Sequence, residues 1–304
     1  KEDKIAKALN SRRGICEDYA ELFTDLCIRS GVRSYVIEGY TKQNGFVDYV
    51  PHVWSASLID STWFLFDPTW GSGYVKDRRF FKHINNLYYK TDPSVLIRSH
   101  MPFDPLWQFL NYPISNQEFA DGRTGQNETK PYFNFIDSIH GFQDQDRTGQ
   151  LLASAYRIEK NGVNNSLIYN ELKYIKMEIE NDRQARIFDL YNGAVASYNA
   201  AILDFNEFIN FRNKQFTPSV NDAEIQQMID VADDGFDKAT SQLARISEPD
   251  VVTRSMIDQL TKAIDGASAQ VKGQKEWLTL YFSKGRTGRR SMFYKYTWFG
   301  IPIN

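Results

Sequence analysis

The sequence predicts an α+β fold in which a helix packs on an antiparallel sheet, followed by an all-α helical bundle. A segment of helical periodicity opens at Cys16, and segments with β-strand character follow it over residues 32–66. From Ser166 onward, apolar residues recur at steps of three and four. The chain has 304 residues, of which 42% are hydrophobic and 24% charged, so it is long enough for two domains with cores of their own.

The first predicted helix begins at Cys16 and stops at Gly31. Its apolar positions are Tyr19, Ala20, Phe23, Leu26 and Cys27. Cys16 precedes the first of them by three positions, so its thiol shares their inward face. The N–H groups and partial positive charge at a helix start favour a thiolate and can bind an oxyanion. Read by itself, Cys16 is equally compatible with a small buried apolar residue.

Cys27 lies eleven residues after Cys16 on the same helix, about 16 Å away at the usual helical rise. That separation excludes a disulfide between them. Because Cys27 is in mid-helix among apolar residues, we expect it in the core. Two unpaired thiols leave the redox compartment undecided.

Three strands are predicted over Val32–Thr41, Tyr49–Ile59 and Thr62–Phe66. Asp60 and Ser61 form a plausible two-residue turn between the last two, which places Ile59 opposite Thr62.

This register places Trp54 opposite Asp67, and His52 shares the face of Trp54 because the two are two residues apart. Asp67 is then the diagonal neighbour of His52, within reach to orient its imidazole. Thiol, imidazole and carboxylate are the parts of a nucleophilic site. The alternative is a structural strand histidine and an aspartate that forms a turn before Pro68.

Three motifs together resemble the transglutaminase-like family of papain-like cysteine enzymes: Gly-x-Cys at Cys16, His-x-Trp at His52 and Asp-Pro-Thr at Asp67. The resemblance implies that these three residues form a catalytic triad. It continues to about residue 120 through Tyr88–Pro93, Ser99–Pro102, Asp104–Gln108 and Phe119, and this later part is similar to the kyphoscoliosis-peptidase branch.

The resemblance implies acyl transfer from a peptide or side-chain amide through a thioester, with a peptidase or amidase favoured over a cross-linking transglutaminase. We expect a protein or peptide substrate and no cofactor. The competing interpretation is a non-catalytic interaction or scaffold protein with a vestigial domain of this family.

Only fifteen residues precede Cys16, and they include no Gln or Trp to complete an oxyanion hole. Asn10 is the candidate for that role, with a surface residue as the alternative. Trp54 and Trp70 are candidates for the substrate groove. His100 is expected to be structural or to line a pocket.

Other classes of protein are disfavoured. The four histidines show no close metal-ligand spacing and no Asp-x-Asp-x-Asp loop is present, so no metal is expected. The net charge is -2 and the basic cluster at residues 284–290 is short, which argues against nucleic-acid binding. No apolar run approaches the roughly 18 residues of a transmembrane segment.

The expected organisation is a catalytic domain over 1–120, a boundary over 121–147, an antiparallel bundle over 148–290 and an aromatic tail over 291–304 that packs as a strand or on the first domain. The bundle is a possible surface for a protein partner. Tyr132–Ile139 is expected to be a strand. The chain begins with Lys1, which predicts a trimmed or processed start and favours an extracytoplasmic location.

Overall fold

The computed structural model describes residues 2–77, 79–293, 297–298 and 301–302. It divides into two compact units, an N-terminal unit Lys1–Asn181 and a C-terminal unit Asp182–Asn304. The division falls inside α8 (Ser166–Asn213), later than the boundary expected at 121–147. The reason is that residues of α7 (Arg147–Asn161) and of the first turns of α8 belong to the core of the N-terminal unit.

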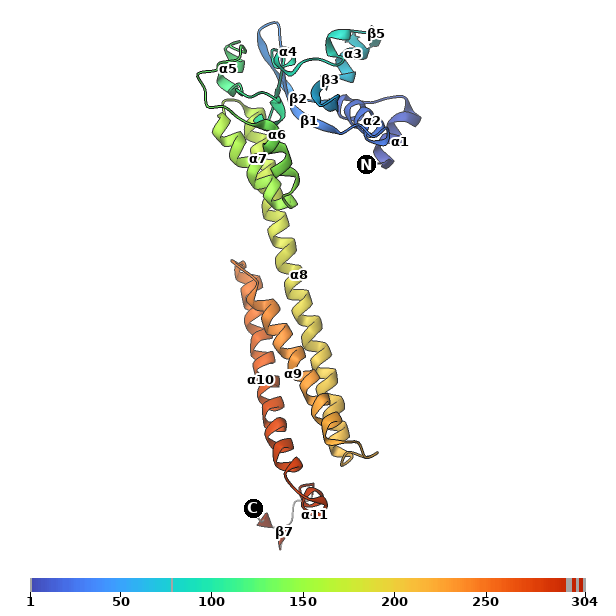
Figure 1. Cartoon of the computed structure of the whole chain (residues 1–304), viewed down its shortest axis with the longest axis vertical. Helices are drawn as coiled ribbons and strands as arrows, with labels where there is room; N and C mark the ends of the chain where they lie inside the picture. The colour runs from blue at the N-terminus through green and yellow to red at the C-terminus, as the bar shows by residue number, and fades with distance from the viewer. Residues whose placement is uncertain (1, 78, 294–296, 299–300, 303–304) are drawn as a thin grey trace. The chain divides into compact units, whose positions relative to one another are not determined.

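A four-stranded antiparallel sheet organises the N-terminal unit (Figure 1). Its strands are β1 (Ser34–Gln43), β2 (Phe46–Ile59), β3 (Thr62–Phe66) and β6 (His100–Pro102), in the order β3-β2-β1-β6. Ile59 pairs with Thr62, which confirms the predicted register. Asp60 and Ser61 both have positive φ, as a two-residue hairpin turn of the primed type requires.

The cysteine-bearing helix is α2 (Cys16–Arg29), and it packs on β2. Ala20 and Thr24 are its buried residues, and the Thr24 hydroxyl donates to Ser55 Oγ of β2 at 3.1 Å. The expectation that Leu26 is buried is wrong: it is 56% exposed, because the face toward β2 follows residues 20 and 24. Cys27 is half-buried rather than a core residue.

The helix α1 (Glu2–Ser11), which sequence analysis did not anticipate, precedes α2. The shorter elements after the sheet are α3 (Pro68–Ser72), β4 (Gly73–Lys76), β5 (Arg79–Lys82), η1 (Asn86–Tyr88), α4 (Pro93–Leu96), η2 (Pro105–Gln108), α5 (Asn116–Ala120) and α6 (Phe135–Gln143). The expectation of a strand over Tyr132–Ile139 is wrong. Asn134 caps the helix α6 by accepting from the Asp137 N–H, and Ile139 faces the core at helical spacing.

Two apolar clusters fill the N-terminal unit. One contains Trp54, Trp63 and Ile139. The other joins Met101 of β6 to residues of α7 and α8. An ion pair to the buried Asp104 adds to the second contact, because the partly buried Arg157 guanidinium of α7 donates to both of its oxygens, at 2.7 and 2.6 Å.

The C-terminal unit is a helical bundle, as the periodicity predicts. After α8 it contains α9 (Asp222–Ala244), α10 (Val251–Phe282), α11 (Arg286–Ser291) and the short strands β7 (Thr297–Trp298) and β8 (Ile301–Pro302). Its core includes Phe208, Phe236 and Leu278 from the three long helices. Among the described residues, no helix combines the length and apolarity needed to cross a membrane.

The expected aromatic tail is described only in part. Phe293 packs in the core of the C-terminal unit, with its ring centroid 5.4 Å from that of Trp277. Tyr294, Tyr296 and Phe299 lie outside the described residues.

Candidate functional site

The fold brings His52 and Asp67 into contact. His52 lies on β2 opposite Gly39 of β1, while Asp67 follows the last residue of β3. A Cβ atom at Gly39 would come within 2.6 Å of the Trp54 ring, so glycine permits this close packing beside His52. His52 Nε2 is 2.8 Å from Asp67 Oδ2. The two side chains therefore meet as diagonal neighbours, in the arrangement that the register predicts.

The Asp67 carboxylate is fully buried and has a partner on each oxygen. Oδ1 accepts from the backbone N–H groups of Thr69 and Trp70 at 2.9 and 3.0 Å, which also caps α3. Oδ2 contacts His52 and, at 3.1 Å, Nε2 of His100. Burial raises the pKa of Asp67, but the hydrogen bonds from His100 and His52 outweigh burial and hold it well below the usual range. The carboxylate is therefore ionised, and hydrogen bonds on both oxygens fix its orientation.

Cys16 is the first residue of α2 and is half-buried. Interaction of its thiol with His52 lowers the pKa of Cys16, against burial, and backbone N–H groups of Val53 and Glu17 add to the lowering. Since Nε2 of His52 is engaged by Asp67, Nδ1 is the ring nitrogen left for the thiol.

Burial by itself lowers the pKa of His52. The interactions with Asp67 and Cys16 raise this pKa by more than burial lowers it, to about 9. A lowered thiol pKa and a raised imidazole pKa favour a thiolate–imidazolium pair at neutral pH.

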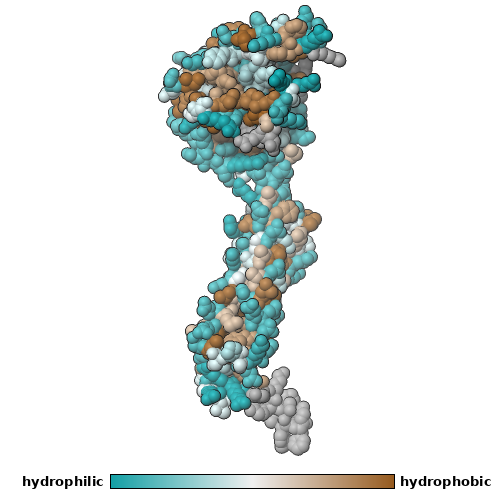
Figure 2. Space-filling view, turned by 90° about the vertical axis from the view of Figure 1, so that its right-hand side faces the viewer, coloured by the Kyte–Doolittle hydropathy of each residue, from teal (hydrophilic) through white to brown (hydrophobic). Residues whose placement is uncertain are grey.

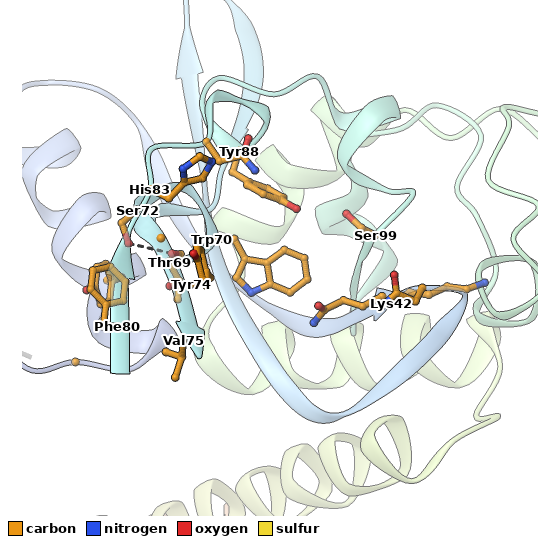
Figure 3. Close-up of a pocket in the computed structure, with 16 residues that line it drawn as sticks. Lys42, Thr69, Trp70, Ser72, Tyr74, Val75, Phe80, His83, Tyr88 and Ser99 are labelled. Carbon is orange, nitrogen blue, oxygen red and sulfur yellow. Dashed lines mark hydrogen bonds between the residues drawn. The ribbon is translucent and has the colours of Figure 1, made fainter. Parts of the chain in front are cut away.

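The three remaining candidates from the sequence lie in different surroundings. The Trp70 ring lies 5.2 Å from the His52 ring and lines an open groove of about 710 Å³ (Figure 3). Trp54 is 1% exposed and packs edge-on against His100, so it lies in the core beneath the site. Asn10 is exposed in the last turn of α1, and no bond joins it to the other candidates within the described ranges.

The similarity to known proteins lies in the same part of the chain as the candidate site. A family model of the transglutaminase-like superfamily matches residues 1–68, which include Cys16, His52 and Asp67. Residues 1–68 belong to the transglutaminase-like superfamily.

Three relatives extend this similarity beyond the matched segment. The chain is 32% identical over 133 residues to kyphoscoliosis peptidase of Homo sapiens and, to the same extent, of Mus musculus. It is 27% identical over 124 residues to hillarin of Drosophila melanogaster. These alignments cover 41% and 34% of this chain, respectively. The chain spans 20% of the length of each peptidase and 15% of hillarin.

His100 is the residue of the N-terminal unit that sequence reasoning undervalued. It is 1% exposed, and its Nδ1 lies 2.8 Å from the Ser99 hydroxyl while its Nε2 faces Asp67. The Ser99–Pro102 segment was the available signal, because it belongs to the part that is similar to the kyphoscoliosis-peptidase branch. Its approach to Asp67 depends on β6 pairing with β1, which no local pattern reveals.

His52, Asp67 and His100 also form a group, among the residues that the structure describes, whose potential metal-ligand atoms all lie within 4.8 Å of one another. These three residues are far apart in the sequence, so their spacing along the chain did not predict that they lie close together. Hydrogen bonds account for the cluster, since Asp67 Oδ2 lies between the two Nε2 atoms.

Proposed function

We propose that the N-terminal unit is a cysteine-nucleophile acyl-transfer enzyme that acts on peptide or side-chain amides of proteins. The supporting observation is the 2.8 Å contact between His52 and the buried Asp67 carboxylate, together with the interaction between His52 and the Cys16 thiol that lowers the pKa of Cys16. Each pKa is displaced in the direction that such a nucleophile needs, because the thiol is more acidic and the imidazole more basic than usual.

The proposed reaction begins when the Cys16 thiolate attacks the carbonyl carbon of the amide, forming a C–S bond. The oxyanion that develops lies near the start of α2, where the backbone N–H of Cys16 is a candidate donor. His52 gives its proton to the leaving nitrogen as the C–N bond breaks, which leaves a thioester and a free amine. Asp67 orients His52 and stabilises its protonated form.

Neutral His52 then takes a proton from the molecule that attacks the thioester. Water yields a carboxylic acid, which is peptidase or amidase chemistry, and an amine yields a new amide, which is transglutaminase chemistry. The peptidase names of two relatives favour water as the acceptor. In both cases the C–S bond breaks and the thiolate is restored.

The second candidate function is a binding module with a vestigial site. One observation favours it: Asn10, the proposed oxyanion donor, is exposed on α1. An oxyanion would then depend on backbone N–H groups, and a weakly stabilised intermediate would leave the thiol without useful turnover.

The pH dependence of Cys16 alkylation by iodoacetamide separates these two functions. In a chain whose only change is Cys27→Ser, we expect Cys16 to react as a thiolate at mildly acidic pH. His52→Ala should return the apparent pKa toward that of a free thiol, because it removes the bond that lowers it. An ordinary thiol pKa that is unchanged by His52→Ala would contradict the enzymatic proposal and support the binding module.

A further inference from the structure

The groove beside Trp70 has two chemically different ends (Figure 3). Tyr74, Val75 and Phe80 of the β4–β5 hairpin line one end. The other end carries hydrogen-bonding groups: Lys42, Gln43, Asn44 and Ser99. Trp70 lies between these two sets in Figure 3, and its ring contacts His52. Gly14, two residues before Cys16, also lines the groove, so the groove adjoins the proposed nucleophile.

The β4–β5 hairpin carries large apolar and aromatic side chains that are exposed to water. Tyr74, Val75, Phe80 and Phe81 are 53%, 69%, 53% and 44% exposed. Exposed apolar side chains are also visible elsewhere on the surface (Figure 2), but here Val75 and Phe80 are paired across two strands, and Tyr74 joins them in the groove lining beside the proposed site. Contiguous exposed apolar surface commonly marks an interaction site.

The two faces of the hairpin are distinct. Val75 pairs with Phe80 and Tyr74 pairs with Phe81, so the two pairs point to opposite faces. Of the two phenylalanines, Phe80 lines the groove and Phe81 does not, while Tyr74, the strand partner of Phe81, also reaches the groove lining. A Cβ atom at Gly73 would come within 2.7 Å of the Phe80 ring, so glycine at this position lets the ring lie across the base of the hairpin.

The hairpin is attached firmly at its base. The backbone N–H of His83 donates to the carbonyl of Ser72, and that of Asn85 to the carbonyl of Gly71, both at 3.0 Å. These bonds hold the apolar side chains beside Trp70 without burying them.

The charges near the apolar end are mainly positive. Lys76, Arg79 and Lys82 are exposed on the hairpin, where Asp77 is the one carboxylate in the described part of the segment. None of these three cations has an ion-pair partner among the residues described. The described residues that line the groove include no carboxylate.

We propose that the β4–β5 hairpin selects the substrate by binding a large apolar side chain against Val75 and Phe80, in a protein segment whose neighbouring residues are acidic. This inference rests on the proposed function and narrows its substrate class. The apolar side chain would lie one or a few residues from the amide that reaches Cys16, because the hairpin and Trp70 line the same groove.

Binding of defined peptides to a Cys16→Ala chain tests the proposal without any chemistry. The probe is a fluorescent heptapeptide with two glutamates and a phenylalanine on one side of a glutamine, and glycine elsewhere. A second probe has the reversed order, because the direction of the chain in the groove is open. Matched probes replace phenylalanine by glycine, or both glutamates by lysine, and fluorescence anisotropy gives each Kd.

We expect the phenylalanine probe, in one of the two orders, to bind about tenfold more tightly than its glycine counterpart, as burial of one large apolar side chain gives. Phe80→Ser should abolish that preference, whereas Phe81→Ser on the opposite face should retain it. The lysine probe should bind several-fold more weakly, and added salt should narrow this difference. Equal melting temperatures of the two serine variants would show that both remain folded.

Equal binding of the phenylalanine and glycine probes in both orders would overturn the proposal, and so would equal effects of Phe80→Ser and Phe81→Ser. Failure of the proposed function is a separate result, since iodoacetamide alkylation measures the thiol and not the groove. A chain with an ordinary Cys16 pKa that still prefers the phenylalanine probe would retain the groove as a peptide-binding site and lose the enzymatic role.

Discussion

His100→Leu tests whether the second histidine holds the Asp67 carboxylate in place. His100 Nε2 lies 3.1 Å from Asp67 Oδ2, and the two residues are 1% and 0% exposed. A hydrogen bond to a buried charged group contributes about 1.5–3 kcal/mol to stability. Leucine is close in size to the imidazole, so we expect His100→Leu to lower the free energy of unfolding of the N-terminal unit by about 2–3 kcal/mol at pH 7.

The effect should depend on pH in a defined direction. Burial lowers the pKa of His100, against its bond to Asp67, so the folded protein resists protonating it while the unfolded chain does not. As pH falls below about 6.5, the ordinary pKa of histidine, the unfolded state gains protons and the wild type loses stability. The variant lacks this loss, so the difference between the two should be largest above pH 7 and smaller at pH 5.

Urea denaturation followed by tryptophan fluorescence at pH 5, 7 and 8 measures these differences. His100→Gln, which keeps an N–H donor, should recover part of the loss, and His83→Leu at an exposed position should change stability by less than about 0.5 kcal/mol. The reasoning is refuted if His100→Leu is no more destabilising than His83→Leu at pH 7, or if its effect grows toward pH 5.

Three further outcomes are expected. Arg157→Met should cost about 1.5–3 kcal/mol in urea denaturation, because the buried Asp104 carboxylate then keeps only the Ser154 hydroxyl and the Leu106 N–H as donors, and Asp104→Asn in the same chain should recover part of it. Phe236→Ala, at a fully buried position of α9, should lower the free energy of unfolding of the C-terminal unit by about 3–5 kcal/mol and leave the alkylation rate of Cys16 unchanged. A matching loss of alkylation would contradict the expectation that the two units have independent cores. The pKa of His52 is raised to about 9, so protonated His52 should add up to about 3 kcal/mol to the free energy of unfolding below about pH 6.5, and this contribution should be lost as pH rises toward 9. A His52→Ala chain whose free energy of unfolding declines in the same way in urea titrations would refute that assignment.

Local patterns in the sequence determined the elements that carry the candidate site. Helical spacing after Cys16 predicted α2, and the Asp60-Ser61 turn set the register of β2 against β3. Because side chains alternate along a strand and a two-residue turn leaves no slack, that register brought His52 and Asp67 to one face without knowledge of the rest of the fold. The long helices of the C-terminal unit could be predicted equally well, because each carries its own apolar stripe.

Only the tertiary structure decided which distant residues complete the site. His100 reaches Asp67 because Thr41 of β1 pairs with His100 of β6, a contact between strands far apart in sequence. The place of α7 and the start of α8 in the N-terminal unit likewise depends on apolar surface supplied by β6 and the loops around it. Helix periodicity and hairpin register are set by neighbours along the chain, whereas these contacts depend on how separate surfaces exclude water together, and the sequence of one segment does not contain the shape of the other.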